Sequence, residues 1–159
     1  VRTVDWVSTQ LPITSRYQIW NFSDSYSSAI PGTEERWLEV ADRDQLNQAI
    51  INIGDTVPNN GTNMEQVFRA VANMNPLPAN IFLITDGLPT LNGRSDPNGL
   101  VTPDERVELF EDAVSELPRG IPVNVLLMPL EGDPSASAAF WLLAQNSQGA
   151  YLTPSKDWP

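Results

Sequence analysis

The stretch ANIFLITDGLPT, residues 79–90, decides the fold of this chain. Its unbroken apolar run, Ile81 to Ile84, has the length of a strand and ends just before Asp86-Gly87. Such a run predicts a central strand that is buried on both faces of a parallel sheet. Asp86 then lies where the strand ends, and ligands of open α/β sheets collect at that edge. A carboxylate there could hold a cation or could simply open a turn with Gly87, and the residues leave both interpretations open.

The composition limits the functions that the chain can perform. With 159 residues, 41% of them hydrophobic, residues 1–159 are expected to form a single domain. Nine Lys and Arg against 20 Asp and Glu give a net charge of -11, which disfavours nucleic acid and anionic membrane surfaces as partners. The absence of Cys and His excludes thiolate and histidine catalysis and leaves carboxylates and hydroxyls, the ligands of Mg²⁺ and Ca²⁺. No apolar run has the length of a membrane span, so no direct membrane insertion by this segment is expected.

Strand and helix patterns alternate along the chain. Strands are predicted at residues 17–23, 81–85, 123–128 and 150–153, all mutually parallel, and at residues 37–40, antiparallel at an edge. Helices are predicted before residue 11, at 42–54, at 62–74, from Thr102, and from Asp133 to a cap at Gly149. Residues 24–32 and 88–101 are predicted loops, the second beside Asp86. The alternation predicts an α/β fold with a doubly wound, mostly parallel sheet and helices on both faces.

A second informative stretch is Asn60-Gly61-Thr62-Asn63, at the start of a predicted helix. Thr62 and Glu65 stand three residues apart. This is the spacing of a capping box, in which the Thr hydroxyl accepts a hydrogen bond from the first turn of the helix. Capping is therefore the structural role that the spacing predicts for Thr62.

The order of these motifs resembles a von Willebrand factor type A domain. The resemblance rests on residues 17–23 (YQIWNFS), 60–63 (NGTN), 82–87 (FLITDG), and Leu143-Ala144 followed by Gly149-Ala150-Tyr151. It implies a sheet whose top carries a metal-ion-dependent adhesion site, normally holding Mg²⁺, with Ca²⁺ or Mn²⁺ as alternatives. It also implies that Thr62 and Asp86 are metal ligands. A carboxylate from a partner protein would complete the metal shell, so the site would bind rather than catalyse.

One element of that family is missing from this sequence. The family's first strand, which carries an Asp-x-Ser-x-Ser motif, should lie one helix before Tyr17, but the residues there read as the remainder of that helix. The strand would stand between those at residues 17–23 and 81–85 and would carry further metal ligands. An upstream segment is expected to supply it; alternatively, the two neighbouring strands pair directly.

Two other classes of function stay open, as does the compartment. A Mg²⁺-dependent hydrolase or phosphotransferase would use Asp86, and a structural module would bind no metal. The glycosylation patterns Asn21-Phe22-Ser23 and Asn60-Gly61-Thr62 lie in a predicted strand and beside the predicted site, where a glycan would obstruct structure or function. They favour a source that does not glycosylate them, such as a bacterium. The location is left open, with an extracytoplasmic one, either periplasmic or secreted, slightly favoured.

Overall fold

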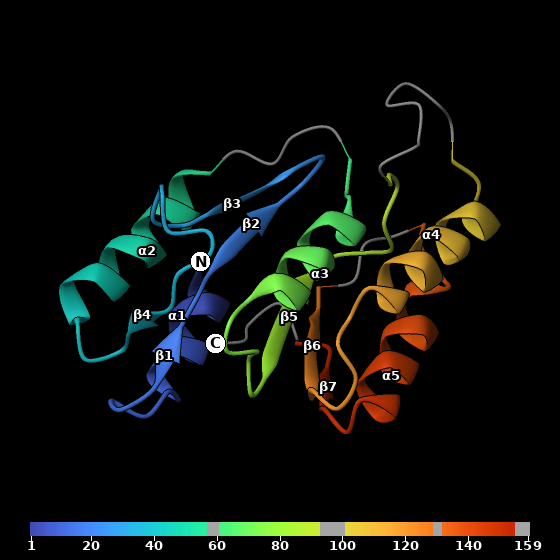
Figure 1. Cartoon of the computed structure of the whole chain (residues 1–159). Helices are drawn as coiled ribbons and strands as arrows, with labels where there is room; N and C mark the ends of the chain where they lie inside the picture. Colours follow the sequence, from blue (N-terminus) through green and yellow to red (C-terminus); the bar gives the residue numbers. More distant parts are fainter. Residues whose placement is uncertain (57–60, 93–100, 129–131, 155–159) are drawn as a thin grey trace.

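The chain is a mixed α/β protein in the computed structural model, which describes residues 1–56, 61–92, 101–128 and 132–154 (Figure 1). In chain order the elements are α1 (Arg2–Thr9), β1 (Arg16–Tyr17), β2 (Trp20–Phe22), β3 (Tyr26–Ser28), β4 (Leu38–Glu39), α2 (Arg43–Asp55), α3 (Met64–Asn73), β5 (Ile81–Thr85), α4 (Pro103–Ser115), β6 (Val123–Leu127), α5 (Ala136–Asn146) and β7 (Tyr151–Leu152). The α/β class predicted from the sequence is thereby confirmed. None of the helices in the described ranges is long and apolar enough to cross a membrane.

Three strands form a parallel sheet in the order β5-β6-β7. Ile81 pairs with Val123 and Thr85 with Leu127, while Val125 pairs with Tyr151. The parallel pairing predicted for these three segments is confirmed. β6 is the central strand, and all its residues except Asn124 are buried. The Asn124 amide donates to the Ile81 carbonyl at 3.2 Å and accepts from the Ala150 N–H at 3.1 Å, so this polar residue links the beginnings of the two outer strands.

The N-terminal strands do not belong to that sheet, so the prediction of four mutually parallel strands is wrong. The segment at residues 17–23 is divided into β1, which pairs antiparallel with β4, and β2, which pairs antiparallel with β3. β3 lies inside the stretch predicted to be a loop. A period of two predicts a strand but specifies neither its partner nor its direction, and β3 lies close enough along the chain to form a hairpin with β2. The antiparallel direction predicted for residues 37–40 is confirmed by β4, but the predicted place at the edge of the parallel sheet is wrong, because β4 pairs with β1 in a separate two-stranded sheet.

β5 also differs from its prediction. It stands at the end of the sheet order rather than in the centre, and the Phe82 side chain is 44% exposed, so burial on both faces is wrong. An apolar run of this length shows that a strand is buried in part, but not how many neighbours it has. The alternative in which β2 and β5 pair directly is wrong as well, because the two strands lie in different sheets. Among the described residues no strand pairs with β5 on its second side.

Two of the helices begin as the sequence predicts. The Asp42 carboxylate caps α2 by accepting from the Gln45 N–H at 3.0 Å. α4 has Pro103 in its first turn and a complete capping box, in which Thr102 accepts from the Glu105 N–H and Glu105 accepts from the Thr102 N–H. α5 begins at Ala136, three residues after the predicted start at Asp133.

The buried side chains form two hydrophobic clusters. The sheet cluster joins the parallel sheet to α3, α4 and α5, and consists of Met64, Val67, Phe68, Leu83, Leu88, Phe110, Ala113, Val123, Val125, Leu127, Ala136, Phe140, Leu143 and Ala144. The N-terminal cluster joins α2 to β1 and β4, and consists of Tyr17, Ala29, Leu38, Val40, Leu46, Ala49 and Ile50. Trp20, Phe22 and Tyr26, from the β2–β3 hairpin, pack against the sheet cluster. The hairpin therefore connects the two halves of the molecule.

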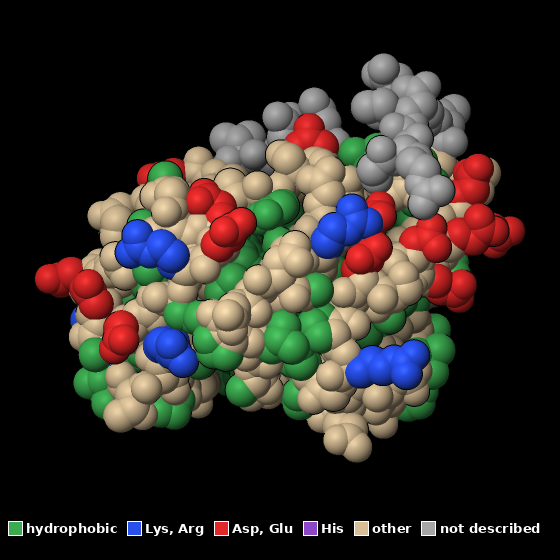
Figure 2. Space-filling view, viewed as in Figure 1, with side chains coloured by type: hydrophobic (Ala, Val, Ile, Leu, Met, Phe, Trp, Pro, Cys, Tyr) green, Lys and Arg blue, Asp and Glu red, His purple; other side chains and the backbone are tan. Residues whose placement is uncertain are grey.

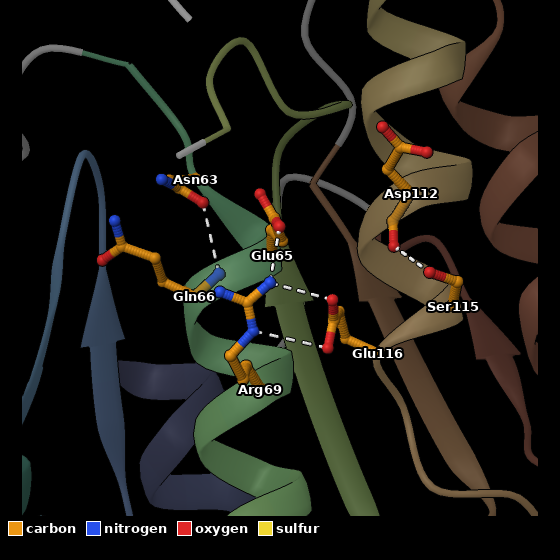
Figure 3. A network of polar contacts seen from close by, with 7 residues as sticks. All are labelled: Asn63, Glu65, Gln66, Arg69, Asp112, Ser115 and Glu116. Atoms are coloured by element: carbon orange, nitrogen blue, oxygen red, sulfur yellow. Dashed lines mark hydrogen bonds and ion pairs between the residues drawn. The ribbon is translucent and has the colours of Figure 1, made fainter. Parts of the chain in front are cut away.

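An ion-pair network joins α3 to the end of α4 (Figure 3). The Arg69 guanidinium lies 2.7 Å from the Glu65 carboxylate within α3 and 2.8 Å from the Glu116 carboxylate at the C-cap of α4. The hydrogen bond and the positive charge of Arg69 lower the pKa of Glu116 below its ordinary value. Because the Arg69 side chain is 53% exposed, the network contributes little to the free energy of unfolding.

Candidate functional site

A cavity of about 260 Å³ opens where β5 ends. Three connections and one helix supply its wall: the residues before α3, the residues after β5, the turn before α5, and α4. Its lining residues are Gly61, Thr62, Asp86, Gly87, Leu88, Thr90, Arg106, Gly132 and Asp133. The two residues predicted to be metal ligands, Thr62 and Asp86, thus line one cavity, at the carboxyl edge of a parallel strand where α/β proteins bind ligands.

Thr62 does not cap α3, contrary to the prediction. The cap is Asn63, whose side-chain oxygen accepts from the Gln66 N–H at 3.2 Å (Figure 3). Asn is at least as good a cap as Thr, and the helix begins one residue later than the Thr62–Glu65 spacing suggests. In the described part of the chain, no hydrogen bond of the Thr62 hydroxyl is found.

The backbone of Thr62 is held by the segment that follows β5. Its N–H donates to the Thr90 hydroxyl at 2.9 Å, and its carbonyl accepts from the N–H groups of Thr90 at 2.9 Å and Leu91 at 3.1 Å. These bonds tie the two connections that carry Thr62 and Asp86 to each other. The position of Thr62 relative to β5 is therefore set by its backbone N–H and carbonyl. Its side-chain hydroxyl takes no part in these contacts.

Asp86 is the first residue after β5, and its side chain is exposed. Within the described ranges no hydrogen bond or ion pair of the Asp86 carboxylate is found. The turn beside it has its own support, because the buried Thr85 hydroxyl donates to the Gly87 carbonyl at 3.1 Å. Asp86 is thus not needed to close the turn, which weakens the structural interpretation of the Asp-Gly pair.

Arg106 and Asp133 form an ion pair in the cavity wall that the sequence analysis missed. The Arg106 Nη2 and Asp133 Oδ2 atoms lie 2.8 Å apart, and their side chains are 21% and 8% exposed. The Asp133 oxygen also accepts from the Leu88 N–H at 2.8 Å, and Arg106 Nη2 donates to the Leu88 carbonyl at 2.5 Å. No sequence spacing connects these three residues, because they come from α4, the turn before α5 and the turn after β5. The Asp133-Pro134 pair instead suggested a helix start.

The oxygen atoms in the cavity suit a partial site for a hard cation. Among the described residues there is no group of three or more acidic side chains that could hold a metal ion. Thr62 and Asp86 offer one hydroxyl and one carboxylate, and Mg²⁺ commonly keeps several waters while binding one or two protein carboxylates. Since Arg106 and Asp133 compensate each other's charge, the charge of Asp86 remains at the cavity. One hydroxyl and one carboxylate are fewer ligands than Mg²⁺ takes, so water or an external carboxylate would have to supply the other positions.

Parts of the predicted site lie outside the described residues. They are Asn60 of the NGTN stretch and residues 93–100 of the predicted loop after β5. On the described surface, acidic side chains gather over α4 (Figure 2).

Comparisons of the chain with models of protein families, with curated proteins and with solved structures found no match.

Proposed function

We propose that the chain is a protein-binding domain, for adhesion or as a scaffold, in which Thr62 and Asp86 hold Mg²⁺. The observation that carries the proposal is that both residues line one cavity at the end of β5. Their side-chain oxygens are available, because Asn63 caps α3 and the turn after β5 is closed by Thr85. A doubly wound arrangement like that of a von Willebrand factor A domain belongs to the proposal, and the parallel order β5-β6-β7 supports it.

The partner group that this site favours is a carboxylate. The chain has a net charge of -11 and repels anions at long range, so an acidic group could approach the cavity closely only when a cation is present. Mg²⁺ at Asp86 would reverse the sign of the local charge and would leave coordination positions for a carboxylate oxygen. Binding of the partner should accordingly require the metal and should be weakened by chelation.

The first test is a Mg²⁺ titration followed by thermal unfolding. A ligand that binds only the folded state stabilises it by about 2.7 kcal/mol at a hundred times its dissociation constant, which raises the midpoint by about 5 to 10 °C for a domain of this size. We expect such an increase in the original chain, a smaller one in Thr62→Val and none in Asp86→Asn. Asp112→Asn is the matched control, because it removes the same charge from an exposed position on α4 outside the cavity.

The outcomes separate the proposal from its competitors. An equal rise of the unfolding midpoint in Asp86→Asn and in the original chain would show that Mg²⁺ binds elsewhere. No rise of the midpoint in any of them would favour a structural module.

The partner group is tested with two peptides that are identical except at one position, which is Glu in one peptide and Gln in the other. The Glu peptide should bind in Mg²⁺ and lose binding in chelator, while the Gln peptide should not bind in either.

A Mg²⁺-dependent hydrolase or phosphotransferase remains the alternative. It would need a second carboxylate beside Asp86 as nucleophile or base, and Asp133 is the acidic residue that shares the cavity. Asp133 is already engaged by Arg106 and by the Leu88 N–H, which supports a structural use of this carboxylate more than a chemical one. Turnover of a phosphate ester that disappears in Asp86→Asn would favour the alternative.

A further inference from the structure

Both backbone polar groups of Leu88 are held by side chains from distant parts of the chain. The Leu88 N–H donates to Asp133 Oδ2 at 2.8 Å, and the Leu88 carbonyl accepts from Arg106 Nη2 at 2.5 Å. These two side chains also pair with each other at 2.8 Å, so the three residues form a closed ring of polar contacts. Leu88 itself is buried, and only one residue separates it from Asp86.

The residue between them, Gly87, fits against the same ion pair. A Cβ atom at this position would lie 2.7 Å from Asp133 Oδ2 and 3.2 Å from Arg106 Nη2. Real Cβ atoms essentially never approach another atom as closely as 2.7 Å, so a side chain here would displace the ion pair or the turn. The buried Nε of Arg106 has no partner, so the guanidinium makes its polar contacts in the described structure through Nη2, toward Asp133 and Leu88.

We propose that Arg106 and Asp133 are positioning residues for Asp86. By holding Leu88, and by packing against Gly87, they fix the direction in which the chain leaves β5 and therefore where the Asp86 carboxylate stands. They set the Mg²⁺ affinity of the cavity without contacting the metal. The part that concerns Mg²⁺ rests on the proposed function of Asp86, whereas the part that concerns the turn does not.

If Arg106 acted only through its charge, its removal would change Mg²⁺ binding in the opposite direction, so an experiment can distinguish the two explanations. Removing the positive charge of Arg106 from the wall of a cation site should strengthen Mg²⁺ binding if charge were the only effect. Removing the contacts that hold the turn should weaken it, because Asp86 would lose its fixed position. The two explanations therefore differ in sign for Arg106, and they also differ for Gly87, which carries no charge.

The experiment measures Mg²⁺ affinity by calorimetry on the full chain. Arg106→Met and Gly87→Ala are each expected to weaken Mg²⁺ binding about tenfold, the lower end of the effect seen when residues that orient metal ligands are lost. Arg106→Lys, which keeps the charge and has donors for both contacts, should recover part of that loss. Arg119→Met is the charge-matched control, because Arg119 is exposed and lies between α4 and β6. This variant should leave the Mg²⁺ affinity unchanged. Tighter binding in Arg106→Met, or unchanged binding in Gly87→Ala, would overturn the proposal.

A second measurement, amide exchange of Leu88 in the absence of metal, tests whether the turn after β5 is held. In Asp133→Ala the Leu88 N–H loses its acceptor, so its amide exchange should become much faster, while Asp112→Ala should not alter it. Unchanged protection of the Leu88 amide would overturn the positioning role, and this result also decides the matter if Arg106→Met fails to fold. An original chain that binds no Mg²⁺ would overturn the proposed function, and the Leu88 amide would still show whether Arg106 and Asp133 hold the turn.

Discussion

At the scale of single residues, Gly149 lies between α5 and β7, where the chain passes close to the first residue of β6. Gly149 follows α5 and was predicted to be its C-terminal cap, but the C-cap is Ser147 and the residue with a positive φ, at 62°, is Gln148. A Cβ at Gly149 would lie 2.0 Å from the Val123 carbonyl oxygen. The prediction of a glycine cap is therefore wrong, and the requirement is the close approach of the turn before β7 to the first residue of β6.

We expect Gly149→Ala to destabilise the fold by about 3 kcal/mol, at the upper end of the cost of overpacking, because the atoms that it meets are backbone and cannot rotate away. Gly32→Ala is the control: its φ is 79° but no atom lies within 4 Å of its Cβ, so it should cost only the left-handed conformation, about 1 to 2 kcal/mol. Urea unfolding of both variants measures the difference. Equal losses would show that the contact with Val123 does not matter.

At the scale of the elements, β5 is the strand with an open side in the described structure. The Ile81 N–H donates to the Pro122 carbonyl at 2.9 Å, and the Thr85 carbonyl accepts from the Met128 N–H at 2.8 Å, so the odd-numbered residues of β5 point their backbone groups toward β6. Because these groups alternate along a strand, those of Phe82 and Ile84 point to the opposite side. The described part of the chain places no strand there.

The alternation predicts a pattern of amide exchange along β5. The Leu83 amide, which points toward β6, should exchange slowly, and the amides of Phe82 and Ile84 should exchange faster unless another strand pairs with them. The measurement is exchange followed by nuclear magnetic resonance, first on the 159-residue chain and then on a version extended upstream. Slow exchange of all three amides in the shorter chain would contradict an open edge. Protection of Phe82 and Ile84 that appears only in the longer chain would support an upstream strand.

At the scale of the whole molecule, the two clusters of buried side chains share no residue. Their strands also lie in separate sheets, so among the described residues no backbone ladder connects the N-terminal cluster to the parallel sheet. The described links between them include the β2–β3 hairpin, which packs on the sheet cluster, and the Trp37 indole N–H, which donates to the Pro76 carbonyl at 2.9 Å. Regions joined by so few contacts can open separately, with different free energies.

Leu46→Ala tests this separation. Leu46 is 2% exposed in the N-terminal cluster, and its truncation should cost about 2 to 5 kcal/mol. We expect amide protection to fall in α2 and to stay unchanged in β6. Phe140→Ala, in the sheet cluster, should lower protection in β6 instead. A fall of equal size in both regions for either variant would show that the molecule unfolds as one unit.

The sequence by itself determined those features that depend on neighbouring residues. The period of apolar residues predicted α1 to α5 and the three strands of the parallel sheet, and the Asp42 and Thr102 caps follow from side chains that reach only three residues along the chain. Asp86 could also be placed at the end of a predicted strand, whereas Thr62 was identified as a ligand only through the resemblance to the von Willebrand factor A family. Their role as metal ligands stays a prediction.

Only the tertiary structure decided which elements are neighbours and what holds the turn after β5. Strand partners depend on contacts across the chain, so the same alternating pattern at residues 17–23 fitted a parallel sheet and an antiparallel hairpin equally well. The ion pair of Arg106 with Asp133 exists because the first turn of α4 and the turn before α5 both lie at the cavity, and the two residues are 27 positions apart in the sequence. Local spacing carries no information about contacts of this kind, because packing of the sheet cluster brings the two residues together.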